Sequence, residues 1–133
     1  MSQIKKSMDQ IIKKLNNFVQ ENKWLGIVDI RKLYNLRRSV LKATNSLPSL
    51  LIKLRLQGNS AAAELIEQAY QRLLFTVDPA EQQKDPKQSK VPYFELNGEG
   101  GLKDCASNLA ETVRQVAEEL EDELPCSQDA ISR

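Results

Sequence analysis

The sequence contains no histidine, and this absence removes the residue on which many active sites depend. Without histidine the chain cannot build a Ser-His-Asp or Cys-His nucleophilic arrangement, or any zinc site with an imidazole ligand. The only glycine cluster, "NGEGG" at 97–101, lacks the spacing of a nucleotide-binding loop and is better explained as a hinge. We therefore expect a chain that is not an enzyme and that needs no metal or cofactor.

Cysteine and long apolar segments are also scarce. Cys105 and Cys126 are too far apart in sequence for a metal motif and too few for a disulfide framework, which favours a reducing compartment. Cys105 falls on an apolar stripe, so we expect a small core residue there. No apolar run approaches the roughly eighteen residues of a membrane span, and residues 1–10 lack the apolar segment of a secretory signal. We expect a cytoplasmic protein without membrane contact.

Aromatic residues make up only 5% of the chain, which favours aliphatic packing of helices over a β-sandwich. Apolar residues recur every three or four positions over 4–18, 33–54 and 102–124, as in helices that bury one face. The expected core positions are Ile4, Met8, Ile11, Leu15, Phe18, Leu33, Leu36, Val40, Ala43, Leu47, Leu50, Leu54, Leu102, Cys105, Leu109, Val113, Val116, Leu120 and Leu124.

Proline and glycine indicate where these helices end. We expect the second helix to start near Val28 and to kink or restart at Pro48, and an Ala/Leu-rich helix to run from Asn59 or Ser60 until just before Pro79. Residues 79–101 are rich in proline and glycine and predict a long mobile loop, in which "VPYFEL" lies extended. Trp24, in the first inter-helix turn, either closes the core or anchors a partner.

The predicted fold is all-α, an antiparallel bundle of four or five helices with the long loop before the last helix. It forms a single domain over residues 1–124, followed by a flexible tail at 125–133.

The nearly neutral net charge of +1 conceals two halves of opposite charge. Residues 1–58 contain twelve cations and three acids, a net charge of +9, whereas residues 59–133 contain seven cations and fifteen acids, a net charge of −8. Charge segregation of this kind is typical of chains that bind a charged partner or pair internally.

Five of the cations lie in "DIRKLYNLRRSVLKATN", residues 29–45. On a helix, Arg31, Asn35, Arg38, Lys42 and Asn45 share one face, away from the apolar stripe. Basic side chains one or two turns apart can reach successive phosphates, and Lys6 and Lys13 would extend the surface from the first helix. The candidate residues for binding the backbone of RNA or single-stranded DNA are Arg31, Lys32, Arg37, Arg38, Lys42, Lys6 and Lys13.

Two other interpretations of the charge remain open. The cations can be a solvated face, or they can pair with the acidic last helix, "AEELEDELP", either within one molecule or head-to-tail between copies. The competing functional hypothesis is a protein-interaction module, an adaptor or chaperone whose acidic helix and apolar stripes dock a partner.

At "IRKLYNL" and "LIKLRL" the sequence resembles the small all-helical subunits of CRISPR effector complexes, and "EQAYQR" with Tyr70 and Arg72 loosely approximates a later motif of some of them. The resemblance implies a nucleic-acid-binding subunit of a larger ribonucleoprotein, with other protein subunits as partners. A looser likeness, through "KATNSL", is to viral helical silencing suppressors that bind double-stranded RNA.

Overall fold

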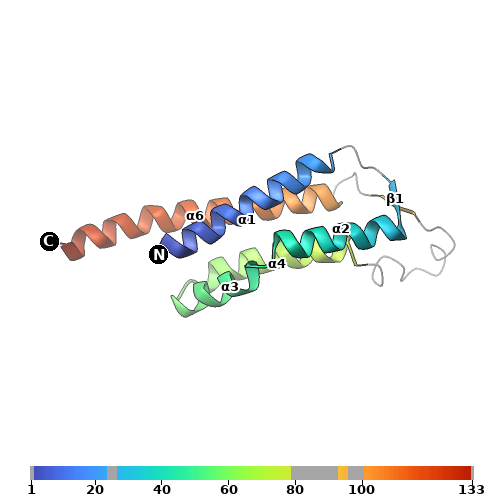
Figure 1. Cartoon of the computed structure of the whole chain (residues 1–133). Helices are drawn as coiled ribbons and strands as arrows, with labels where there is room; N and C mark the ends of the chain where they lie inside the picture. Colours follow the sequence, from blue (N-terminus) through green and yellow to red (C-terminus); the bar gives the residue numbers. More distant parts are fainter. Residues whose placement is uncertain (1, 24–26, 79–92, 96–100, 133) are drawn as a thin grey trace.

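The structure is a computed structural model that describes residues 2–23, 27–78, 93–95 and 101–132, with the backbone alone for residues 2, 3, 27, 93–95 and 121–132. In this part of the chain helices predominate, and two short strands accompany them (Figure 1). The elements are α1 (Ser2–Glu21), β1 (Ile27–Asp29), α2 (Ile30–Ala43), α3 (Leu47–Leu56), α4 (Ser60–Thr76), β2 (Tyr93–Glu95) and α6 (Leu102–Ser132). The all-α bundle predicted from the sequence is confirmed.

The helices form an elongated bundle in which α1 and α6 lie antiparallel along each other (Figure 1). Helix α4 packs on α6 and on α3, while α2 and α3 both pack on α1. The C-terminal end of α6 continues beyond the start of α1, so it projects from the bundle. The faces of α1 and α2 that point away from these contacts lie on one side of the molecule.

The predicted apolar stripes form much of the core. The core also includes residues that the sequence analysis did not select, among them Leu51 of α3, Ala63, Ile66 and Leu73 of α4, and Val77 just after α4. Every predicted core residue whose side chain the structure describes is buried, from Ile4 in α1 to Leu120 in α6. Leu124 lies outside the described side chains. Thr44 is buried as well, and its hydroxyl donates a hydrogen bond of 2.7 Å to the carbonyl of Val40, so the polar atom is satisfied inside the core.

The predicted start of the second helix near Val28 is wrong. Strand β1 occupies this position, and α2 begins at Ile30. Val28 pairs with Phe94 in an antiparallel two-stranded ribbon, so the extended conformation predicted for "VPYFEL" is confirmed at Tyr93–Glu95. Pairing with a second extended segment keeps Val28 out of the helix, a long-range effect that helix periodicity does not contain. Asp29 then caps α2, because its side chain accepts a hydrogen bond of 2.9 Å from the backbone N–H of Lys32.

Pro48 marks a restart, one of the two outcomes predicted. Helix α2 ends at Ala43 and α3 begins at Leu47, which places Pro48 in the first turn, where its missing N–H leaves no hydrogen bond unmade. Gly58 ends α3 with a positive φ of 84°, a conformation that glycine adopts at little cost. Helix α4 follows Asn59 and ends at Thr76, before Pro79 as expected.

Helix α6 does not end at Pro125. Its backbone stays helical to Ser132, so the helix extends through most of the segment predicted as a flexible tail. An interior proline removes one amide donor and its ring crowds the carbonyl of the preceding turn, at a cost of about 3 kcal/mol, but its φ near −65° is itself helical, so a helix can continue through it. Most of the predicted loop at 79–101, and Trp24, lie outside the described residues.

The cap on α2 gives the first prediction. We expect Asp29→Ala to lower the free energy of unfolding by about 1 kcal/mol, because the N–H of Lys32 loses its acceptor. Asp29→Asn is the matched control and should lose only a few tenths, since asparagine caps equally well. Urea unfolding followed by circular dichroism measures both, and equal losses in the two variants would show that the cap does not stabilise α2.

Candidate nucleic-acid interface

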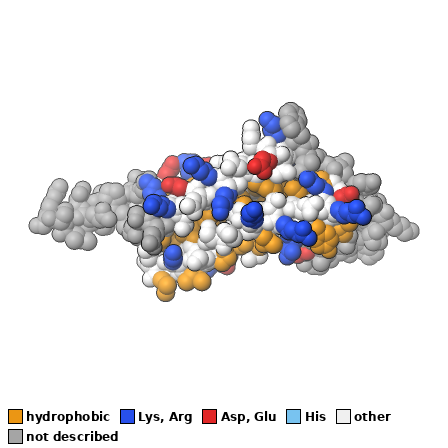
Figure 2. Space-filling view, in the orientation of Figure 1, with side chains coloured by type: hydrophobic (Ala, Val, Ile, Leu, Met, Phe, Trp, Pro, Cys, Tyr) orange, Lys and Arg blue, Asp and Glu red, His pale blue; other side chains and the backbone are white. Residues whose placement is uncertain are grey.

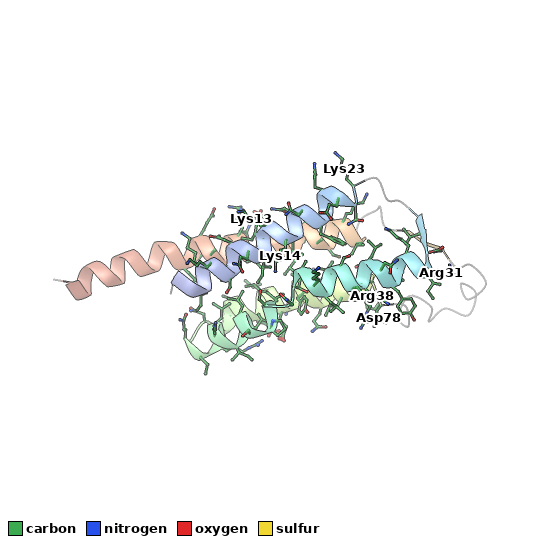
Figure 3. The ribbon with its side chains drawn as sticks, in the orientation of Figure 1. Lys13, Lys14, Lys23, Arg31, Arg38 and Asp78 are labelled. Carbon is green, nitrogen blue, oxygen red and sulfur yellow. The ribbon has the colours of Figure 1, made fainter. Side chains whose placement is uncertain are left out.

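All seven predicted contact residues are exposed: Arg31, Lys32, Arg37, Arg38 and Lys42 on α2, and Lys6 and Lys13 on α1. Figure 2 shows lysine and arginine side chains spread over the face of the molecule that α1 and α2 form, with few acids among them. In Figure 3 the labelled Lys13 and Lys14 lie on α1, and Arg31 and Arg38 follow the length of α2. The fold therefore gathers cations from two helices on one side.

None of the seven side chains makes an ion pair or a hydrogen bond with another described residue. Ion pairs are formed by other cations. Arg55 of α3 contacts Glu67 at 2.7 Å and Glu64 at 3.7 Å, and these pairs join α3 to α4. Within α6, Arg114 pairs with Glu111 and Glu118. The first acid of the "EELEDE" run is therefore partnered inside its own helix, and the side chains from Glu121 onward lie outside the description.

Helix geometry separates the five cations of α2 into groups. Arg31, Arg38 and Lys42 are spaced seven and four residues apart, so they follow one outer line of the helix, as predicted. Arg37 is rotated about 100° from Arg38 and lies toward α4, where it lines a groove with Leu41 and residues of α4. Ser39 lies on the side of α2 that faces α1. Lys32 is two turns earlier in the helix and therefore lies on the same side.

An open groove of about 340 Å³ runs between α1 and α2, with Lys14 on one wall and Lys42 on the other. The buried side chains of Phe18 and Ala43 line it, and they hold the two helices together beneath the charges. The remaining lining residues are Asn17, Glu21 and Ser39. Two ammonium groups, an amide and a hydroxyl provide the donors that bind a phosphate, and Glu21 adds the single negative charge.

Lys14 was missed by the sequence prediction, which chose Lys6 and Lys13 from α1. Lys6 and Lys13 point outward, on the side of α1 opposite its buried stripe, whereas Lys14 lies on the flank next to α2. Position on the helical wheel shows that Lys14 borders the stripe, but only the packing shows which neighbour lies on that side.

Cys105 has the predicted place in the core, being 8% exposed where α4 meets α6. Burial raises the pKa of its thiol, the charge of Asp104 raises it further, and the charge of Arg72 opposes both. The thiol therefore stays protonated near neutral pH and is a poor nucleophile. On the exposed face of α6, hydrogen bonding from Arg114 lowers the pKa of Glu111.

Neither a metal site nor a membrane helix is found in the described part of the chain. Its cysteine and acidic side chains form no group of three or more that could hold an ion, and none of its helices combines the length and apolar character needed to cross a bilayer. Comparison with protein-family models, with curated proteins and with solved structures gives no significant match. The resemblance to small CRISPR subunits therefore stays a hypothesis.

The burial of Cys105 predicts slow thiol chemistry. In a Cys126→Ser background, which leaves one thiol, we expect iodoacetamide to label Cys105 at least about tenfold more slowly in the folded protein than in urea. The rate should rise with pH in both states, since the thiolate is the reactive form. Equal rates in the folded and unfolded protein would contradict a buried thiol with a raised pKa.

Proposed function

We propose that this chain binds the sugar-phosphate backbone of RNA or single-stranded DNA through the basic face of α1 and α2. The observation that carries the proposal is the line of Arg31, Arg38 and Lys42, which is exposed and has no acidic partner among the described residues. The protein would act without catalysis, as a cytoplasmic subunit of a larger assembly.

The dimensions of this face suit a phosphate backbone. From Arg31 to Lys42 the helical rise corresponds to roughly 16 Å, enough to follow several phosphates. Asn35 lies on the same line and can donate to sugar or phosphate oxygens. Lys14 and Lys42 would hold one phosphate between them in the groove, while Lys13 and Lys6 extend the track along α1.

The resemblance to small CRISPR subunits makes an RNA-guided complex the specific assembly to test. In this fold "IRKLYNL" is the start of α2 and thus carries the basic line, whereas "LIKLRL" lies in α3, with Leu51 and Leu54 in the core. A role there requires protein partners as well as nucleic acid.

The competing hypothesis of an adaptor loses part of its basis in this fold. Its apolar stripes were expected to dock a partner, but their described residues are buried between the helices of the bundle. The described cations of α1 and α2 are on the surface instead, which favours a charged ligand.

Salt dependence tests the proposal directly. If about six phosphates are contacted, affinity for a labelled oligonucleotide should fall by about three orders of magnitude between 50 and 200 mM salt. We expect Arg31→Gln/Arg38→Gln to weaken binding. For a single strand, the magnitude of the slope of log association constant against log salt concentration should fall by about 1.4. Fluorescence anisotropy with single-stranded and duplex RNA and DNA provides the measurement.

A charge-matched control distinguishes a local interface from general attraction. Lys103→Gln/Arg114→Gln removes two cations from α6, and we expect it to leave the slope within about 0.3 of the wild-type value. A wild-type protein that binds none of the four oligonucleotides at 50 mM salt, or equal effects of the two double variants, would refute the proposed interface.

The groove between α1 and α2 makes a narrower prediction. If Lys14 and Lys42 hold the same phosphate, Lys14→Gln and Lys42→Gln should each weaken binding, and the double variant should lose little more than the stronger single change. Additive losses would show that the two lysines contact separate phosphates. Anisotropy titrations at one salt concentration measure this coupling.

A further inference from the structure

A second groove, of about 370 Å³, lies between α2 and α4 and differs in character from the basic face. Leu41 of α2 and Leu74 and Phe75 of α4 line it, with Leu41 37% and Phe75 52% exposed. Tyr34 is 49% exposed and precedes Leu41 by two turns, so it continues the apolar side of α2. Large apolar side chains clustered on a surface commonly mark a binding site.

Arginines lie on both sides of this apolar surface. Arg37 lines the groove on the α2 side. Arg72 lines the adjoining hollow on the other side of Phe75, together with Gln71. Asp78, two residues after the end of α4, is the one acid among the lining residues of the two grooves. Aromatic and arginine residues are the types most enriched at the energetic centres of protein interfaces.

We propose that the groove between α2 and α4 docks an acidic amphipathic helix of a partner protein. The apolar side of that helix would cover Leu41, Leu74 and Phe75, and its flanking carboxylates would meet Arg37 and Arg72. A groove lined by two helices is straight over a few turns, which matches a third helix with apolar residues at three- and four-residue spacing. The arginines select against a basic helix, since like charges would be brought together.

The location supports a protein over a nucleic acid as the occupant. A phosphate backbone gains little from apolar contact, whereas Leu41 and Phe75 are the part of this surface that binding would remove from water. Ile52 and Leu56 on α3 are exposed apolar residues as well, but neither lines a groove among the described cavities. They therefore provide an apolar control surface outside the proposed docking groove.

This inference does not depend on nucleic-acid binding. Leu41 is rotated about 60° from Arg38, so the apolar flank borders the outer line of Arg31, Arg38 and Lys42 but uses different side chains. The two ligands would therefore not compete for the same side chains. It does change the role of Arg37, which the sequence assigned to the phosphate contacts and which we place at the protein groove.

The experiment uses the full chain and three synthetic peptides of about 18 residues, long enough for partial helicity in water. The first has leucines at three- and four-residue spacing and glutamates elsewhere. The second replaces every glutamate with lysine, and the third scrambles the first. Binding of each labelled peptide is measured by fluorescence anisotropy, with circular dichroism confirming that every protein variant is folded.

We expect saturable binding of the acidic amphipathic peptide alone, weakened at least tenfold by Leu41→Ala/Phe75→Ala and unchanged by Leu56→Ala. Arg37→Glu/Arg72→Glu should reverse the preference in favour of the lysine peptide. If the first double variant fails to fold, Phe75→Ala alone should still weaken binding at least threefold.

The proposal is overturned if the acidic peptide does not bind, if the scrambled or lysine peptide binds wild type as well, or if the Leu41 and Phe75 changes alter affinity by less than twofold. Oligonucleotide binding by the Leu41→Ala/Phe75→Ala variant should equal that of wild type. This readout separates a failure of the docking groove from a failure of the basic face.

Discussion

The packing of α1 along α6 is the contact on which the rest of this structure depends. It joins the two ends of the sequence, and it buries the apolar stripes of a basic helix and of an acidic one against each other. Because the stripes face inward, the charged side chains face outward. Arg55 pairs with Glu64 and Glu67 where α3 meets α4, whereas Arg31, Arg38 and Lys42 have no acidic partner among the described residues. The basic face is a consequence of this arrangement.

Helix α2 illustrates how one short element can serve three purposes. Leu33, Leu36 and Val40 fix it to the bundle, its outer line presents Arg31 and Arg38 to solvent, and its flank brings Leu41 beside α4. A helix has room for these roles because successive residues are rotated by about 100°. The same geometry means that neighbouring residues such as Arg37 and Arg38 belong to different surfaces.

Much of the fold was predictable because the signals were local. The three- and four-residue spacing of Ile4 through Phe18, and of Leu102 through Leu120, identified both helices and their buried sides. The β1–β2 pairing was not predictable, since Val28 becomes extended only through contact with a segment more than sixty residues away. The helical backbone beyond Pro125 was missed because proline was treated as a helix terminator.

The candidate site was predictable only where local spacing along one helix determines it. Exposure of Arg31, Arg38 and Lys42 follows from the pattern of α2 alone, but the convergence of Lys14 on Lys42 depends on which helix lies beside α1. The groove of Leu41 and Phe75 likewise joins residues that are 34 positions apart in sequence. Surfaces built between helices require the tertiary structure.

The basic face of α1 and α2 is tested most directly by mapping backbone amide chemical-shift changes by NMR while a short single-stranded RNA is added to the full chain. We expect the largest changes on the outer side of α2, at Arg31, Arg38 and Lys42, and on α1 around Lys14. Changes concentrated on α4 and α6, or none at low salt, would contradict the proposed interface.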